Sequence, residues 1–122
     1  MIEEDTAHAM DFEALRGAIE GREADLMLGF YAEDAGLRVV NGGSADGPVF
    51  ELKGRSQIER YLHAVCDQDV ACAVGDVDVE EGRISFSEAC EYPDGTNVLV
   101  RTTLELRGGR IFRQLDVVER QP

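Results

Sequence analysis

Three charged residues in the C-terminal half of the chain have the types and spacing for acid–base chemistry. Glu88, Arg101 and Asp116 each lie in a run of otherwise apolar or β-branched residues. Two carboxylates in different environments can be pushed to different pKa values, so that one serves as acid and the other as base. An arginine between them would orient the base, and its charge would also lower the pKa of a neighbouring carboxylate.

Two turns determine how these three residues face one another. Asp94-Gly95 and Gly108-Gly109 both suit two-residue hairpin turns, which need positive φ. Counting outward from the turns pairs Arg101 with Glu88 on one side and with Asp116 on the other. Opposed side chains have Cβ atoms about 4.5–5.5 Å apart, close enough for charge-assisted hydrogen bonds. The sequence therefore predicts a row Glu88–Arg101–Asp116 across three strands.

The face that carries this row also mixes aromatic, aliphatic and polar side chains, as pocket linings do. The other predicted pocket residues of this face are Phe86, Cys90, Leu99, Thr103 and Gln114. Tyr31 could hydrogen-bond a ligand, and His63, whose pKa is ordinarily near neutral, could reach the pocket as an acid–base group. Packing is the alternative for Tyr31 and Cys90, and a helix surface is the alternative for His63.

The same row has a structural interpretation that the residues leave open. A buried ladder of ion pairs would be kept satisfied because an unpaired charge inside a protein costs several kcal/mol. The row is thus either catalytic or a structural salt bridge. The opposite face is the more apolar and is predicted to meet a second copy of the chain in a homodimer. That face is predicted to carry Val98, Val100, Leu104, Leu115 and Val117.

The elements that must position these residues follow from hydrophobic periodicity. A helix is expected from Phe12, with Asp11 as its N-cap, and a second, short helix ends near Tyr31–Ala35. A strand covers 36–41, a loop covers 43–54, and Ser56 with Glu59 forms a capping box that starts a third helix. Strands are expected near 70–80, 83–92, 97–107 and 111–120. Helices followed by hairpins predict an α+β fold with helices on one sheet face.

Length and charge exclude several classes of protein. The chain has 122 residues, of which 43% are hydrophobic, and a net charge of −13. One domain, 1–122, is expected, with a flexible segment at 1–10. Lys53 is the only lysine, so no nucleic-acid partner is expected, and neither a secretory signal nor a membrane segment is predicted.

Three cysteines, with no C-x-x-C pair, suggest neither a disulfide framework nor a zinc site. No other spacing of histidines, cysteines and carboxylates suggests a metal site, and no metal or cofactor is predicted. A reducing compartment, and hence a cytoplasmic protein, is the expectation.

The order of these elements resembles the nuclear-transport-factor-2-like superfamily, and its SnoaL-like branch most of all. The motifs that carry the resemblance are YAEDA (31–35), KGRSQIERYL (53–62) and GGRIFRQLD (108–116), and it covers roughly residues 11–119. The resemblance implies a cystatin-like fold, in which a cone-shaped, curved antiparallel sheet wraps around N-terminal helices and encloses a pocket. Members of the superfamily are often dimeric through the convex face.

Residue by residue, the chain is similar in part to limonene-epoxide hydrolases. Arg101 matches their arginine, Asp116 matches the water-activating aspartate, and Asn41 matches an asparagine that holds the water. Val39 stands where those enzymes have a tyrosine, and Thr103 stands where they have a second aspartate.

Two other enzyme classes of the superfamily bear on the prediction. Ketosteroid isomerases have acids at the positions of Val39 and Arg101, so their chemistry is not expected here. SnoaL-type polyketide cyclases use an acid–base aspartate in the last strands, a role that Asp116 could fill. The predicted function is a cofactor-independent hydrolase, cyclase or isomerase that acts on a small, mostly apolar molecule. The alternative is a non-catalytic ligand-binding or dimerisation domain.

Overall fold

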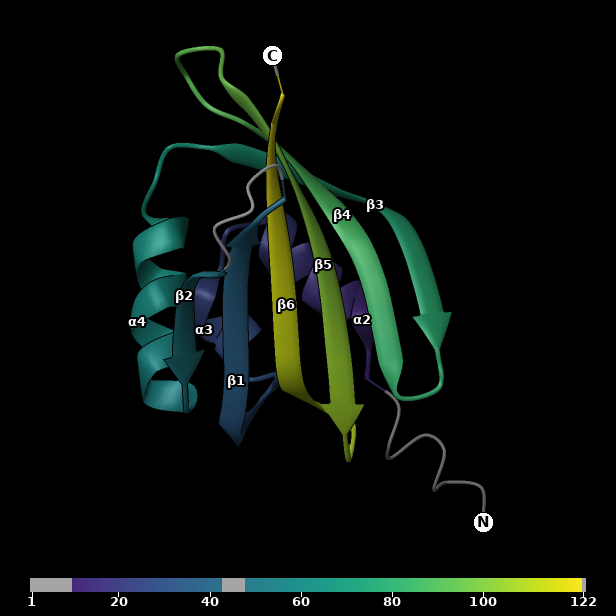
Figure 1. Ribbon diagram of the computed structural model, residues 1–122. Coiled ribbons are helices and arrows are strands. Elements are labelled where there is room, and N and C mark those ends of the chain that lie inside the picture. Colours follow the sequence, from purple (N-terminus) through teal and green to yellow (C-terminus); the bar gives the residue numbers. More distant parts are fainter. Residues whose placement is uncertain (1–9, 43–47, 122) are drawn as a thin grey trace.

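The protein is described by a computed structural model that covers residues 10–42 and 48–121 (Figure 1). The predicted flexible segment 1–10 lies outside these residues except for Met10. The elements are α2 (Phe12–Glu20), α3 (Ala24–Leu28), β1 (Tyr31–Asn41), β2 (Pro48–Lys53), α4 (Arg55–Cys66), β3 (Ala71–Glu80), β4 (Arg83–Glu91), β5 (Asn97–Arg107) and β6 (Arg110–Gln121).

The strands form one curved sheet whose inner face carries the helices. The strand order is β2-β1-β6-β5-β4-β3, and every neighbouring pair is antiparallel except β1 and β6, which are parallel. The helices α2, α3 and α4 lie on the side of the sheet that faces away from the viewer in Figure 1. This arrangement confirms the predicted α+β cone, with one parallel pair in a sheet that was expected to be antiparallel.

Two of the helices follow their sequence patterns closely. Asp11 caps α2 by accepting a hydrogen bond from the Ala14 amide at 3.2 Å. In α4, Ile58 and Leu62 are buried, as the spacing predicted. The predicted Ser56–Glu59 capping box is wrong, because the N-cap is Gly54, two residues before Ser56, and it makes no side-chain hydrogen bond. The Glu59 side chain is therefore available for other contacts.

Two segments near the second helix differ from the prediction. The structure begins β1 at Tyr31, so YAEDA is strand rather than the end of a helix. The structure also makes Pro48–Lys53 a strand, where a loop was predicted. Phe50 pairs with Val39 and Leu52 pairs with Leu37. This short alternating run therefore forms a strand by pairing with β1. The Gly and Pro residues before it obscured that alternation.

The hairpin between β4 and β5 has a longer turn than the prediction assumed. The Tyr92 amide donates to the Thr96 carbonyl at 2.9 Å, so three residues connect the strands instead of two. Every pair therefore moves by one residue, and Glu88 faces Val100 while Arg101 faces Ser87. Because side chains alternate between faces, this shift places Glu88 and Arg101 on opposite sides of the sheet.

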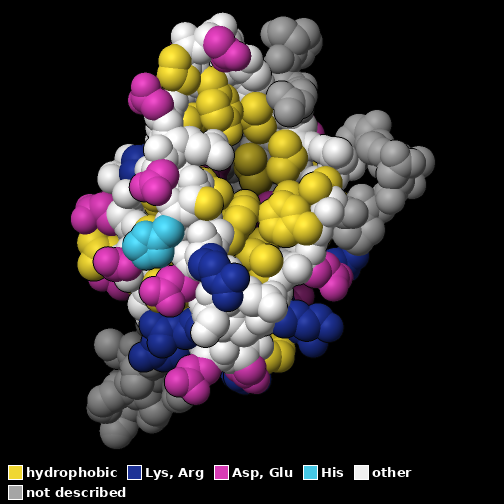
Figure 2. All heavy atoms as spheres, turned by 90° about the vertical axis from the view of Figure 1, so that its left-hand side faces the viewer, with side chains coloured by type: hydrophobic (Ala, Val, Ile, Leu, Met, Phe, Trp, Pro, Cys, Tyr) yellow, Lys and Arg dark blue, Asp and Glu magenta, His cyan; other side chains and the backbone are white. Residues whose placement is uncertain are grey.

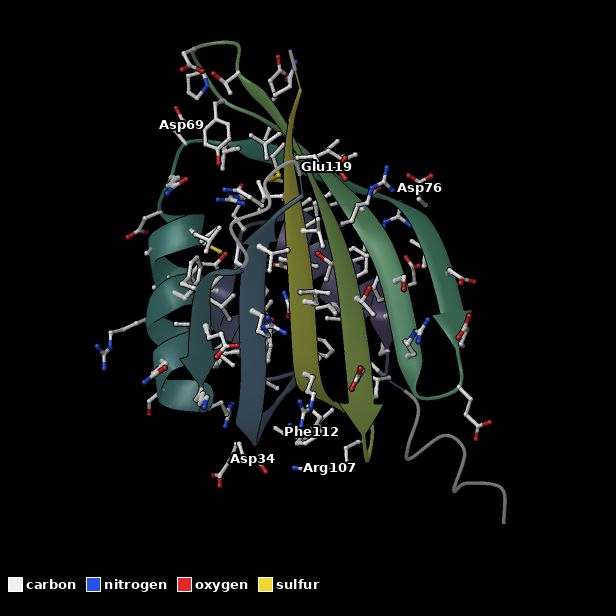
Figure 3. The ribbon with its side chains drawn as sticks, viewed as in Figure 1. Asp34, Asp69, Asp76, Arg107, Phe112 and Glu119 are labelled. Carbon is white, nitrogen blue, oxygen red and sulfur yellow. A yellow bond between two sulfur atoms is a disulfide. The ribbon has the colours of Figure 1, made fainter. Side chains whose placement is uncertain are left out.

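The hairpin between β5 and β6 keeps its two-residue turn but contains a bulge. Arg107 faces Arg110 as predicted, yet the ladder shifts between Glu105 and Leu106 because Phe112 is an extra residue in β6. The Arg107 guanidinium lies over the Phe112 ring at 4.0 Å and also bonds Asp34 at 2.6 Å (Figure 3). These contacts hold the extra residue at the end of the sheet.

The two corrections redistribute the predicted faces. Thr102, not Arg101, faces Asp116, and both are buried on the inner face. The predicted dimer face is therefore wrong as a single surface. Its residues fall on both sides of the sheet: Val98, Val100 and Leu104 on the inner side, Leu115 and Val117 on the outer side. The homodimer itself stays a prediction.

The inner face and the helices enclose one apolar core. The largest side chains that are fully buried there are Leu15, Leu37, Ile58, Leu104 and Ile111, together with Thr102. Across residues 10–42 and 48–121, the structure contains no helix that is both long and apolar enough to span a membrane.

Candidate functional site

A partly enclosed cavity of about 60 Å³ lies between the helices and the inner face of the sheet. Most of its wall is apolar, with side chains from α2, α3, α4 and the strands. Its lining residues are Leu15, Ile19, Met27, Tyr31, Tyr61, Leu62, Val65, Phe86, Glu88, Leu104, Ile111, Gln114 and Asp116. Two carboxyl groups, an amide and two tyrosine hydroxyls are thus the polar groups of an otherwise apolar site.

Asp116 is held in place by hydrogen bonds to one of its two oxygens. Its Oδ1 accepts from Thr102 Oγ1 and from Gln114 Nε2, each at 3.0 Å. The Tyr31 hydroxyl in turn donates to Gln114 Oε1, so the amide is fixed at both ends. No described residue donates to Asp116 Oδ2. One oxygen of a residue that lines the cavity is therefore oriented by the protein.

Burial gives Asp116 an unusual affinity for its proton. The side chain is buried, and this burial raises its pKa from 3.8 to about 6, against the opposing effect of the two hydrogen bonds. No ion pair to Asp116 is found among the described residues. The charge of this group is thus stabilised by neutral donors rather than by a cation.

Glu88 is a second carboxyl group with a raised pKa. Burial, and next the neighbouring Asp116, raise its pKa from 4.5 to about 7, and the nearby charge of Arg22 lowers it in part. Within the described residues, the Glu88 carboxylate accepts no hydrogen bond and forms no ion pair. The two carboxyl groups face one apolar cavity and change charge near neutral pH.

The tyrosines of the cavity are neutral hydroxyl donors. Burial raises the pKa of both Tyr31 and Tyr61, and the charges of Asp116 and Glu88 raise it further. Tyr61 also packs against Phe50, with ring centroids 5.3 Å apart. Sequence reasoning missed Tyr61 as a site residue because its spacing marked it only as part of the apolar face of α4.

Arg22 lies behind Glu88 and was not predicted. It has a positive φ of 58°, its Nη2 donates to the Val65 carbonyl, and its Nη1 lies 3.7 Å from Cys72 Sγ. The sequence holds no signal for this position, because Arg22 stands in a turn between two helices. Its charge lowers the pKa of Glu88.

The structure does not bring Arg101 into the site. Arg101 is exposed on the outer face and forms an ion pair with Glu119 at 3.4 Å (Figure 3 labels Glu119). The predicted row Glu88–Arg101–Asp116 is wrong because each hairpin shifts by one residue. The two carboxyl groups do share a face, since the two shifts together leave both of them on the inner side.

The other predicted pocket residues divide in the same way. Tyr31, Phe86 and Gln114 line the cavity, and Val39 is buried beside Asp116 as its partner in the parallel pair. The remaining ones do not line it. Leu99 and Thr103 are on the outer face, Asn41 is exposed at the end of β1, and His63 is exposed on α4.

The cysteine prediction is wrong in one respect. Cys72 and Cys90 are directly opposed on β3 and β4 and form a disulfide, while Cys66 is free. Two cysteines far apart in sequence gave no recognisable spacing, and the register of a hairpin brought them together. Cys90 is thus a disulfide partner rather than a cavity residue. A reducing compartment was expected because the cysteine spacing suggested no disulfide, and the disulfide removes that reason. A cytoplasmic location stays a prediction.

One group of possible metal ligands adjoins the cavity. The Cys72 and Cys90 sulfurs and a Glu88 carboxylate oxygen lie within 4.8 Å of one another. Because the two sulfurs are bonded to each other, they do not offer thiolates to a metal ion. Of these groups only Glu88 lines the cavity, and the disulfide lies beside it.

Comparison with solved structures confirms the fold. An NTF2-like protein of unknown function from Mesorhizobium loti has a TM-score of 0.76 and 16% identity, over 88% of this chain and 86% of that one. A second match is the epoxide hydrolase/cyclase-like enzyme SalBIII, which has a role in pyran ring formation in the polyether salinomycin. It has a TM-score of 0.64 and 15% identity, over 88% of this chain and 85% of that one.

A third match is to a designed protein, so likeness in fold alone does not assign a function. A de novo designed protein with a curved β-sheet has a TM-score of 0.66 and 18% identity, over 93% of this chain and 89% of that one. No family model and no curated protein matches the chain. The chain therefore has the NTF2-like fold that the motifs predicted, and its function must be argued from the site.

Proposed function

We propose that this chain is an acid–base enzyme that needs no cofactor and acts on a small, mostly apolar molecule as a hydrolase, cyclase or isomerase. One observation carries the proposal: two carboxyl groups without an ion-pair partner among the described residues face the same apolar cavity. Buried carboxyl groups of this kind are disfavoured unless a function keeps them, and acid–base sites are where they gather.

In the proposed reaction Asp116 is the base and Glu88 the acid. Near pH 7 Asp116, with a pKa of about 6, is mostly ionised, while Glu88, with a pKa of about 7, keeps a substantial protonated fraction. Such values suit proton transfer at neutral pH. Thr102 and Gln114 orient Asp116, so that its free Oδ2 can take a proton from water or from a carbon acid.

The tyrosines supply the third component of the proposal. A neutral hydroxyl can donate to an oxygen on which negative charge develops, and this stabilisation is strong in a site that excludes water. Tyr61 lines the cavity, and no hydrogen bond from its hydroxyl is found among the described residues. Tyr61 is therefore the proposed donor to the substrate oxygen, whereas the Tyr31 hydroxyl is occupied with Gln114.

The proposed substrate is small and mostly apolar because of the surroundings of the two acids. The partly enclosed space of about 60 Å³ takes a reacting group or a water molecule. Figure 2 shows hydrophobic side chains gathered around a hollow on the side of the molecule that carries α4. In the proposal the rest of the substrate lies in this hollow, with its reacting end toward the carboxyl groups.

A ligand-binding or dimerisation domain without catalysis is the second candidate. The small volume of the cavity favours the dimerisation form of this candidate, since sites for drug-sized ligands usually enclose about 300–1,000 Å³. In that case Asp116, Thr102 and Gln114 would serve mainly to connect β5 and β6 through a buried polar group.

The test is turnover of small apolar epoxides and enolisable ketones, followed by gas chromatography. Asp116→Asn is expected to lower kcat by about 100-fold or more, the usual contribution of a general base. The matched control, Arg101→Ala, should leave kcat unchanged because this residue lies on the outer face. A carboxyl titration by ¹³C NMR gives an independent check. Asp116 and Glu88 resonances that both titrate at ordinary values would exclude the proposed roles.

A further inference from the structure

A second group of chemically capable side chains lies on the outside of the helices. Glu59 and His63 stand four residues apart on one face of α4, and Asp25 of α3 reaches the same place. The His63 Nε2 and Asp25 Oδ1 atoms are 3.0 Å apart. One ligand atom from each of the three residues lies within 4.8 Å of the other two.

We propose that Asp25, Glu59 and His63 form a binding site for one divalent transition-metal ion such as Zn²⁺. An imidazole nitrogen and two carboxylate oxygens are a ligand set that zinc and its neighbours in the series accept. This proposal is independent of the acid–base function, because none of the three residues lines the cavity.

The geometry needs only small movements to receive the ion. Metal–ligand bonds of about 2.0–2.2 Å place neighbouring ligand atoms roughly 3–4 Å from one another. The present spread of up to 4.8 Å is slightly larger. Asp25, Glu59 and His63 are all exposed, so their side chains can close by rotation without disturbing the core. Three protein ligands leave the remaining positions of the ion to water.

The charge of the molecule favours the same conclusion. The chain carries a net charge of −13, which raises the concentration of cations near its surface. Figure 2 shows acidic side chains around the histidine on this face. Two carboxylates that bind the same ion no longer repel each other. Because the three side chains are exposed, binding the ion removes little of their solvation.

The site would connect two helices that both contribute to the cavity wall. The helix α3 has five residues and no side-chain N-cap, so little in its own sequence stabilises it. It carries Met27, and α4 carries Tyr61, both of which line the cavity. A metal ion held between Asp25 and α4 would therefore fix the distance between these two parts of the wall.

The test is isothermal titration calorimetry of the full chain with ZnCl₂, after removal of metal with EDTA and without reductant. One Zn²⁺ per chain is expected. Asp25→Asn, Glu59→Gln and His63→Ala should each weaken binding by about tenfold or more, since even an outer-shell partner of a metal usually contributes that much. Zn²⁺ should also raise the midpoint of thermal unfolding of the parent protein but not that of His63→Ala.

Three matched variants exclude other sources of binding. Glu23→Gln removes the same charge two residues from Asp25, His8→Ala removes the other histidine, and Cys66→Ser removes the free thiol. All three should bind as the parent does. The proposal is overturned if the parent does not bind Zn²⁺ at millimolar concentration. It is also overturned if Glu23→Gln weakens binding as much as Asp25→Asn, or if binding is lost in His8→Ala or Cys66→Ser.

Discussion

The molecule holds two groups of acids that differ in their environment more than in their chemistry. Glu88 and Asp116 face an apolar cavity, whereas Asp25 and Glu59 lie beside His63 on the outside of the helices. Burial makes the charged form of a carboxyl group costly, so the inner pair holds protons near neutral pH. The outer pair has solvent around it and a nitrogen ligand beside it. The difference teaches that depth in the fold decides whether a carboxyl group exchanges protons or attracts a cation.

The first way to break this comparison is to measure stability against pH. Burial raises the pKa of Asp116 from 3.8 to about 6. Below pH 3.8 both the folded and unfolded states carry the proton. Between pH 3.8 and about 6 the unfolded state loses it while the folded state keeps it, which favours the unfolded state. Stability should therefore fall as the pH rises from about 4 to 6, by about 3 kcal/mol for this residue at 1.36 kcal/mol per pKa unit. Glu88 acts in the same direction up to about pH 7.

Chemical denaturation at a series of pH values measures this slope. Ile58→Val is a suitable control, because it removes a buried methyl group and should cost about 1 kcal/mol at every pH. A parent protein whose stability rises steadily from pH 4 to 8 would show that the inner pair is ionised at no cost, and the comparison would fail.

Replacing Asp116 by its neutral isostere sharpens the comparison further. Asp116→Asn keeps an oxygen for Thr102 and Gln114 but removes the buried charge. At pH 8 this variant should be more stable than the parent by about 2 kcal/mol, since most of the ionisation cost disappears. Thermal unfolding at pH 8 and at pH 4.5 measures the effect, which should be small at the lower pH. A salt-bridged structural role predicts the opposite sign, namely a loss of stability at pH 8.

Arg22 connects the inner pair to the rest of the protein. Arg22→Met removes the hydrogen bond to the Val65 carbonyl, which should cost about 1.5 kcal/mol. It also removes the charge that lowers the pKa of Glu88, so that pKa should rise above about 7 in a ¹³C NMR titration. Arg16→Met is the control, because Arg16 makes a similar bond to the Val74 carbonyl. Its loss should affect stability alone, and an equal rise in the Glu88 pKa would contradict the assigned role of Arg22.

The smallest effect is expected at Arg101, a surface charge adjacent in sequence to a buried hydroxyl. Arg101→Ala breaks only an exposed ion pair with Glu119, so stability should change by less than about 0.5 kcal/mol. Thr102→Val removes the donor to the buried Asp116 and should cost about 1–2 kcal/mol. Urea unfolding of the two variants compares them directly. If Arg101→Ala proved the more damaging, the register of β5 would be in question.

Part of the site could be predicted from the sequence because strands alternate between two faces. Glu88, Asp116, Tyr31, Phe86 and Gln114 were expected at the pocket, and all five line the cavity. Their roles there stay proposals. Arg101, Leu99 and Thr103 were placed on the wrong face. Each extra residue in a hairpin moves the predicted side chains of the strand to the opposite face of the sheet. The turn at Pro93–Gly95 and the bulge at Phe112 each added one.

The chain by itself determined most of the elements that form, with β2 and the start of β1 as the exceptions. Local spacing gave α2 its cap at Asp11, gave α4 its buried face, and gave β3 to β6 their approximate bounds, since these features depend on residues close in sequence. Only the tertiary structure decided which charges are buried together and which meet outside. The Cys72–Cys90 bond, the place of Arg22 behind Glu88, and the meeting of Asp25 with His63 all join residues at least 18 positions apart. Such contacts depend on register and on helix packing, and no local pattern in the sequence records either of them.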